Sequence, residues 1–211
     1  MVKCNSMELH KIIEIIKPDI IFEELSDDVF NQCYGEKKRI TLETTSIKEY
    51  LKINNIKHIP VATYEIPISD HDSFDKMFQK ITGNNEFRLL LDKLIEYGYI
   101  YGFSYLNNKH CDILHEIIKE HKKKIIDYFD DKYLSKIYSL WVDYNEKKEN
   151  IMINNIYNYS KKYQYDNAIL FIGAAHRKSI IMKINKLKRK LEPKLNWGFF
   201  DFKKYCEANG I

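Results

Sequence analysis

Two glutamates and one histidine stand where apolar segments end, a position that suits acid–base or metal chemistry. Glu23 and Glu24 end an apolar segment near the N-terminus, and His176 follows the uncharged run 168–172 and Gly173. A carboxylate and an imidazole can coordinate a divalent metal ion together, or act as a general acid–base pair on a bound water molecule. We therefore predict that Glu24 and His176 are the catalytic residues and the ligands of any divalent metal ion.

These side chains can meet only if both segments are parallel strands of one sheet. Five consecutive apolar residues at 168–172 are typical of a strand that helices bury on both faces. Gly173 allows a sharp exit from that strand and a close backbone approach, so we include it among the substrate-binding candidates. His176 would then lie at the carboxyl end of the strand, where open α/β sheets bind ligands. Glu23 and Glu24 point to opposite faces of an extended segment, so only one of them is expected in a given pocket.

The remaining segments predict an α/β fold with a mostly parallel central sheet flanked by helices. Pro60 lies in one expected strand and favours its start or a sheet edge. Residues 70–163 contain no convincing strand and predict a large helical insertion over one end of the sheet, whose aromatic residues core packing explains better than a lid does. We expect a single α/β domain over residues 1–211. The expected helices are 6–17, 46–54, 73–81, 86–97, 112–129, 132–163 (with an interruption near Asn145) and 178–191, and the expected strands are 19–25, 58–63, 168–172 and, as a strand or docked tail, 195–202.

The composition limits the class of protein. Hydrophobic residues make up 45% and charged residues 30% of the 211 residues, which indicates a globular protein rather than a disordered or fibrous one. The net charge of +4 is too small to predict nucleic-acid binding. Four widely spaced cysteines without a Cys-x-x-Cys pair favour a reduced, intracellular protein. No signal peptide and no membrane span is evident, so we expect a cytoplasmic location.

Other catalytic motifs find little support. The chain has no Gly-rich phosphate loop, no Gly-x-Ser-x-Gly elbow and no His-Glu-x-x-His motif. The remaining histidines are weaker candidates than His176, and we expect them at the surface: His10, His58, His71, His110, His115 and His121.

Three segments resemble a known group of proteins. Residues 12–25, which run through Pro18-Asp19 to Glu24-Leu25, resemble the helix, Pro-Asp, strand, Glu-Leu signature of the TraB/PrgY/GumN family. This family belongs to a superfamily with the Tiki metalloproteases and the erythromycin-esterase/ChaN-like proteins. Residues 171–176 are similar to its C-terminal Gly-x-x-His motif, and residues 149–152 resemble the polar helix before that strand.

The resemblance implies an α/β pocket that gathers Glu24 and His176. Tiki-type relatives hydrolyse peptides with a metal ion, esterase-type relatives work without one, and other members bind peptide pheromones. Relatives begin with a further strand that ends in a histidine, and we expect this chain to lack that strand. Relatives also carry an acidic residue near the position of Ala62, and Glu65 is the nearest candidate to replace it.

The sequence therefore leads to competing functional hypotheses. The first is a hydrolase-like protein in which a Glu/His site activates water, with or without a divalent metal ion. In this hypothesis Glu23, Glu65, Asn150 and Gly173 are the substrate-binding candidates. The second is a non-catalytic module of the same fold that binds a peptide or a small molecule. Nucleic-acid binding through the basic face of residues 183–194 ranks last.

Overall fold

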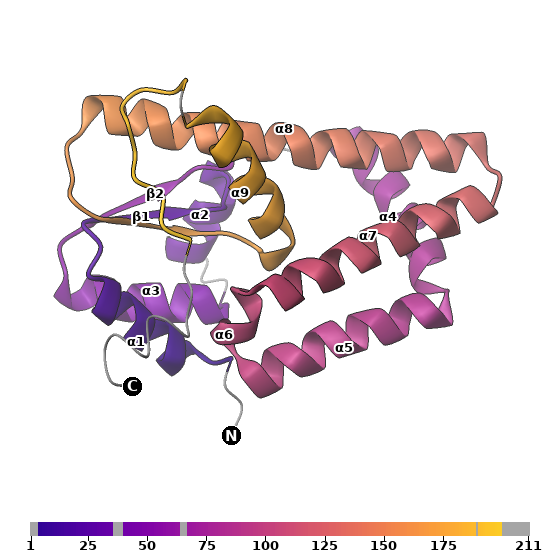
Figure 1. The fold of residues 1–211 in the computed structure, drawn as a ribbon, viewed down its shortest axis with the longest axis horizontal. Coiled ribbons are helices and arrows are strands. Elements are labelled where there is room, and N and C mark those ends of the chain that lie inside the picture. Colours follow the sequence, from indigo (N-terminus) through magenta and orange to yellow (C-terminus); the bar gives the residue numbers. More distant parts are fainter. Residues whose placement is uncertain (1–3, 36–39, 64–66, 189, 200–211) are drawn as a thin grey trace.

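The fold combines a small parallel sheet with many helices (Figure 1). The computed structural model describes residues 4–35, 40–63, 67–188 and 190–199. Within these residues the strands are β1 (Ile20–Glu23), β2 (Lys57–Pro60) and β3 (Ala168–Phe171). The helices are α1 (Ser6–Ile16), α2 (Asp27–Tyr34), α3 (Leu42–Ile53), α4 (Ile68–Thr82), α5 (Asn85–Tyr101), α6 (Phe103–Leu106), α7 (Lys109–Tyr128), α8 (Lys132–Lys162) and α9 (Ala174–Leu187). An α/β fold with a parallel sheet is therefore confirmed, although helices dominate it.

The sheet has the strand order β2-β1-β3, and both pairings are parallel. Glu23 at the end of β1 is in register with Pro60 of β2 and Phe171 of β3, so all three strands end at one edge of the sheet. Pro60 lies in an edge strand, as predicted. The prediction that 168–172 is buried on both faces is wrong, because β3 forms the other edge of the described sheet and its residues are only half-buried.

The two faces of β1 pack against different helices. Ile20 and Phe22 belong to a core cluster with residues of α8 and α9, whereas Ile21 belongs to a cluster with residues of α1 and α3. Side chains alternate along a strand, so Glu23 follows the face of Ile21 and Glu24 follows the face of Phe22. The expected separation of the two carboxylates is therefore present.

Local hydrogen bonds set helix boundaries that the apolar pattern did not locate. Asn5 caps α1 by accepting the N–H of Glu8, and the helix ends at Ile16, one residue before the predicted end. Helix α3 begins at Leu42, four residues before the predicted start, because Thr41 and Thr44 form a reciprocal capping box. The predicted interruption near Asn145 is absent from α8.

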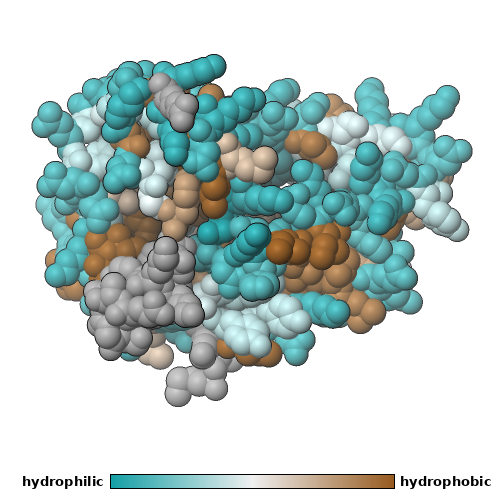
Figure 2. Space-filling view, viewed as in Figure 1, coloured by the Kyte–Doolittle hydropathy of each residue, from teal (hydrophilic) through white to brown (hydrophobic). Residues whose placement is uncertain are grey.

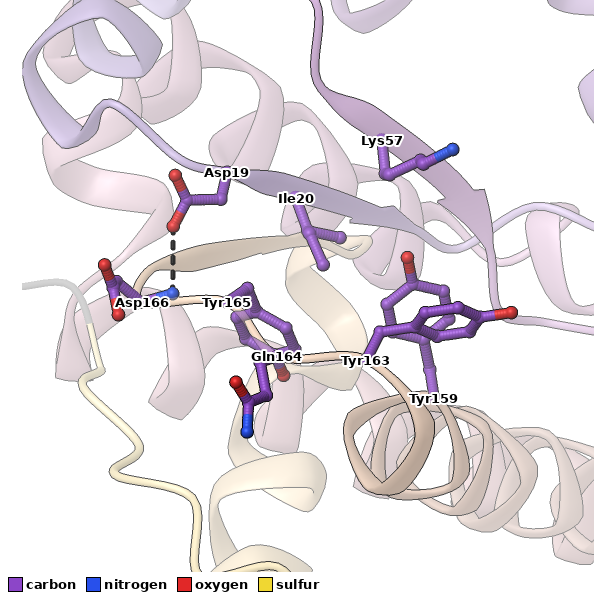
Figure 3. Close-up of a pocket in the computed structure, with 8 residues that line it drawn as sticks. All are labelled: Asp19, Ile20, Lys57, Tyr159, Tyr163, Gln164, Tyr165 and Asp166. Atoms are coloured by element: carbon purple, nitrogen blue, oxygen red, sulfur yellow. Dashed lines mark hydrogen bonds between the residues drawn. The ribbon is translucent and has the colours of Figure 1, made fainter.

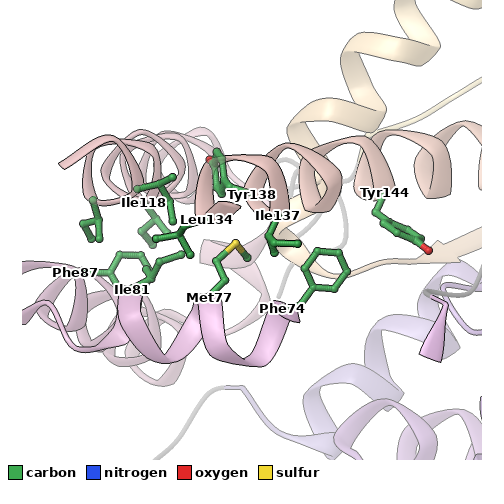
Figure 4. Packing of buried hydrophobic residues seen from close by; sticks show 11 residues of the cluster. Phe74, Met77, Ile81, Phe87, Ile118, Leu134, Ile137, Tyr138 and Tyr144 are labelled. Carbon is green, nitrogen blue, oxygen red and sulfur yellow. The ribbon is translucent and has the colours of Figure 1, made fainter. Parts of the chain in front are cut away.

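The predicted insertion is helical from α4 to α8 and has its own hydrophobic core (Figure 4). Much of this helical block extends away from the sheet, and α7 returns to contact α9 (Figure 1). Core packing accounts for Tyr105, which is buried, but it fails for Tyr97, Tyr99 and Tyr101, which are exposed. The buried residues of this core are Phe74, Met77, Ile81, Phe87, Ile118, Ile125, Ile126, Leu134, Ile137, Tyr138 and Tyr144.

The face of the protein shown in Figure 2 is mainly hydrophilic, and the described part of the C-terminal tail forms no strand. Figure 2 shows mainly hydrophilic side chains, with a hydrophobic patch where α5 and α7 run side by side. No helix in the described part of the chain is long and apolar enough to cross a membrane. Residues 195–199 form no strand; Trp197 donates its indole N–H to the Tyr157 hydroxyl, and the expected residues 200–202 lie outside the described part.

Candidate functional site

The carboxyl edge of the sheet brings Glu24 and His176 together. Glu24 directly follows β1, and His176 lies in the first turn of α9, after the short exit from β3. Glu24 Oε1 lies 3.3 Å from His176 Nε2, and both side chains are largely buried. The parallel register explains this contact, because it aligns the ends of β1 and β3.

The second ring nitrogen of His176 faces a carboxylate that the sequence did not identify as a site residue. His176 Nδ1 lies 2.8 Å from Oε1 of Glu149, whose side chain is only 6% exposed. Burial alone would raise the pKa of Glu149, but hydrogen bonds from His176, Ser179 and Lys183 outweigh it and hold the pKa below its ordinary value. Glu149 is therefore a carboxylate at neutral pH, and Nδ1–H of His176 is the donor.

Glu24 is held from two further directions. The Lys148 ammonium lies 2.6 Å from Glu24 Oε1, and the main-chain N–H of Gly173 donates to Oε2 at 2.6 Å. A Cβ atom at position 173 would lie 3.4 Å from that oxygen, which is an ordinary van der Waals contact. Gly173 thus positions Glu24, while its place beside the cavity keeps the prediction of substrate binding open.

A cavity of about 950 Å³ adjoins this edge of the sheet. Glu23, Glu24 and Gly173 line it, together with apolar residues of α1, β3 and α9, whereas His176 is not among the described lining residues. The volume falls within the range of small-molecule sites, roughly 300–1,000 Å³. Arg177 is the one cationic residue among the described lining residues, and its guanidinium pairs with Asp112 of α7 at 2.5 Å. The cavity therefore gives a ligand access to Glu24.

A second hollow lies at the opposite, amino edge of the strands (Figure 3). Its volume is about 480 Å³, and Asp19, Lys57 and three tyrosines contribute to its lining. Asp19 Oδ2 accepts hydrogen bonds from the main-chain N–H groups of Asp166 and Asn167. These bonds hold the segment that precedes β3 against the start of β1. This hollow is distant from the Glu24–His176 contact, and we assign it no role in the chemistry.

Glu23 lies on the other face of β1, where it makes a separate buried cluster. It still lines the same cavity as Glu24, so the expectation that only one of the two carboxylates lies in a given pocket is wrong. Its Oε2 accepts the Tyr34 hydroxyl at 2.8 Å and lies 2.7 Å from Nε2 of His58. The expectation of a surface position is wrong for His58, whose side chain is 6% exposed. Burial first, and then the Glu23 carboxylate, raise the pKa of Tyr34, so its hydroxyl stays protonated. The contact depends on strand register and on α2, neither of which the spacing of histidines could predict.

The start of α7 brings polar groups from the insertion toward His176. Burial, Lys122 and the His176 imidazole lower the pKa of His115, although Asp112 opposes them. His115 Nε2 and Asp112 Oδ1 are buried and have no hydrogen-bond partner in the described part of the chain. The expected surface position is therefore wrong for His115 as well.

The other predicted and overlooked residues can now be placed. Asn150 is exposed on α8, away from the Glu149 contacts, and Glu65 lies outside the described residues. Glu149 was missed although a signal existed. It shares the apolar helix face of Met152, Ile153 and Ile156, and a carboxylate on a buried face requires partners.

The donor set near Glu24 does not fit a dedicated metal centre. Protein sites for a catalytic zinc ion supply three ligands, whereas Glu24 and His176 supply two. The described residues contain no group of three or more His, Cys, Asp or Glu side chains that could hold a metal ion. The Lys148 ammonium also occupies a cation position against Glu24 Oε1.

Comparisons with known proteins leave the family question open. No family model matches the chain, and neither a curated protein nor a solved structure matches it. The resemblance to the TraB/PrgY/GumN family remains a prediction.

Proposed function

We propose that this protein is a hydrolase in which Glu24, His176 and Glu149 activate water beside the cavity. The observation that carries the proposal is the position of the His176 ring between two carboxylates, with Nδ1 on Glu149 and Nε2 beside Glu24. A histidine that one carboxylate orients from behind is the usual arrangement of a general base. Glu24 lines the cavity, so a substrate bound there would contact its carboxylate.

The geometry supports the following roles. The Glu149 carboxylate keeps a proton on His176 Nδ1, so that Nε2 is the basic nitrogen. Nε2 and Glu24 Oε1 are two acceptors 3.3 Å apart, and they can hold between them the proton that an attacking water gives up. Lys148 offsets the negative charge of Glu24. The same proton can then pass to the leaving group, which completes hydrolysis of an ester or amide.

The cavity wall also offers donors for the developing oxyanion. The first N–H groups of a helix lack intrahelical partners, and α9 begins at Ala174 on the wall of the cavity. Arg177 lies one turn farther along α9 and also lines the cavity. We assign these groups to stabilising the tetrahedral intermediate.

The test is turnover of p-nitrophenyl butyrate and of a fluorogenic peptide amide in the presence of EDTA. We expect His176→Ala to lower kcat/KM by roughly 10²- to 10⁴-fold, the usual contribution of a general base. Glu149→Gln should also lower it, whereas His110→Ala and Glu146→Gln, which replace exposed residues, should not. Absence of turnover by the wild type, or equal turnover by His176→Ala, would contradict the proposal. Activity that appears only with added manganese, cobalt or zinc would favour the metal-assisted route.

A non-catalytic binding module remains the second candidate, and one observation favours it. Each charged group of the site already has partners within the chain: Glu24 contacts Lys148 and Gly173, and Glu149 contacts His176 and Lys183. A network of hydrogen bonds and ion pairs whose members are all satisfied stabilises the fold even when it takes part in no reaction. Ligand binding in the cavity without turnover would support this candidate.

A further inference from the structure

Glu23 is a buried carboxylate among the residues that line the cavity. Its side chain is only 8% exposed, and Tyr34 and His58 both contact Oε2. Oε1 has no hydrogen-bond partner in the described part of the chain, yet it is not sealed from solvent. Because Glu23 is a lining residue and Oε1 is not fully buried, we take Oε1 as the acceptor for a ligand in the cavity.

The surroundings fix this carboxylate in place. The Tyr34 and His58 rings pack edge to face at 4.5 Å, and Phe30 packs against His58 at 4.7 Å. Both polar contacts fall on the same oxygen, so neither competes for Oε1. The raised pKa of Tyr34 keeps its hydroxyl as a permanent donor. A ligand group at Oε1 would therefore meet a pre-organised acceptor that loses little conformational freedom on binding.

The charges on the cavity wall favour a positively charged ligand group. The Arg177 guanidinium is paired with Asp112, and the Glu24 carboxylate is paired with Lys148. Glu43 also lines the cavity, is exposed and makes no ion pair within the described residues.

Lys48 is the nearby cation on α3, and its position leaves the acceptor free. Its ammonium donates to the Cys33 carbonyl at 2.5 Å and stacks on the Tyr34 ring, without contacting a carboxylate. Among the described lining residues, Glu43 is thus a carboxylate without an ion pair, and the ionisable partner of Glu23 with possible positive charge is the His58 imidazole.

We propose that the cavity binds a primary amine on an apolar body, with the ammonium on Glu23 Oε1 and within the field of Glu43. The apolar body would lie against Leu9, Ile12 and the residues of β3, which form much of the remaining wall. An ammonium has three donors and no acceptor, which matches the carboxylate oxygens of Glu23 and Glu43 on this part of the wall. This inference does not rest on hydrolysis, since binding alone fulfils it.

The experiment is calorimetric titration of the full chain at pH 7 with hexylamine, hexan-1-ol and hexanoate. Each probe has six carbons, and the head groups are cationic, neutral and anionic respectively. We expect hexylamine to bind roughly 10-fold or more tightly than hexanol, since a hydrogen bond between charged groups supplies at least that difference. Hexanoate should bind more weakly than hexanol.

Two variants and a control make the outcome decisive. Glu23→Gln keeps the shape and should reduce hexylamine to the affinity of hexanol, and Glu43→Gln, at an exposed position, should reduce it several-fold. Glu96→Gln removes an exposed charge on α5 and should change nothing. If Glu23→Gln does not fold, Glu43→Gln and the order of the three probes still decide the question. No binding of hexylamine, binding of hexanoate as tight as that of hexylamine, or indifference to Glu23→Gln would overturn the proposal, whether or not the protein hydrolyses esters.

Discussion

At the scale of single residues, Glu149 connects the chemistry of the site with the stability of the fold. Its carboxylate accepts hydrogen bonds from Ser179 and His176, and an ion pair to Lys183 adds a third contact at 3.0 Å. Removal of one member of a buried charge network leaves the others desolvated and uncompensated. The same contacts that orient His176 therefore stabilise the packing of α9 on α8.

Glu149→Gln should destabilise the protein in a pH-dependent way. The pKa of Glu149 is lower in the folded state than its ordinary value of 4.5, so its ionised form contributes stability at neutral pH, and that contribution is lost as the pH falls below that value. We expect a loss of about 3 kcal/mol at pH 7, by analogy with broken buried ion pairs. Urea unfolding of wild type and variant at pH 7 and in acid measures this difference. If the difference in free energy of unfolding between wild type and variant stays constant as the pH falls below 4.5, the ionised Glu149 carboxylate does not stabilise the fold.

At the scale of elements, two ion pairs connect α7 of the insertion to α9, the helix that carries His176. Arg177 of α9 pairs with Asp112 of α7, and the two side chains are 16% and 14% exposed. One turn farther along α7, Glu116 pairs with Lys178 at 3.2 Å, but these side chains are 43–44% exposed. The two pairs join the same helices and differ mainly in burial.

This difference predicts unequal effects of two alanine substitutions. Asp112→Ala should lower the free energy of unfolding by about 3 kcal/mol, because it leaves the Arg177 charge buried without its partner. Glu116→Ala should cost at most about 1 kcal/mol, since exposed pairs contribute little. Chemical denaturation of both variants under one condition provides the comparison. Equal losses would show that burial of the Arg177–Asp112 pair has no energetic importance.

The sequence predicts elements better than it predicts their contacts. Local spacing locates β1 within the predicted strand 19–25, β3 and the exit at Gly173, and most of the long helices, but it does not predict α2 or α6. The half-burial of β3 does not, because a continuous apolar run is equally compatible with a central and an edge strand. The partners of His58 and His176 depend on which helix covers which face, and this information lies in long-range packing.

At the scale of the whole molecule, two bodies of helices meet at the carboxyl edge of a small sheet (Figure 1). The insertion has its own core, centred on residues such as Met77 and Phe87, and it does not need the sheet to bury them. It still contributes Glu149 and Asp112 to the surroundings of His176. The candidate site therefore lies where the two bodies join, and the cavity opens beside it.

We propose that Glu149 fixes the proton of His176 on Nδ1 and so leaves Nε2 to act with Glu24. Long-range ¹H–¹⁵N spectroscopy of the imidazole rings, with His176→Ala to assign the signal, tests this claim most directly. We predict that Nδ1 carries a proton at every pH at which the protein is folded and Glu149 is ionised, and that Glu149→Gln weakens this preference. A neutral His176 with its proton on Nε2 would contradict the account, because the nitrogen beside Glu24 could then not accept a proton from water.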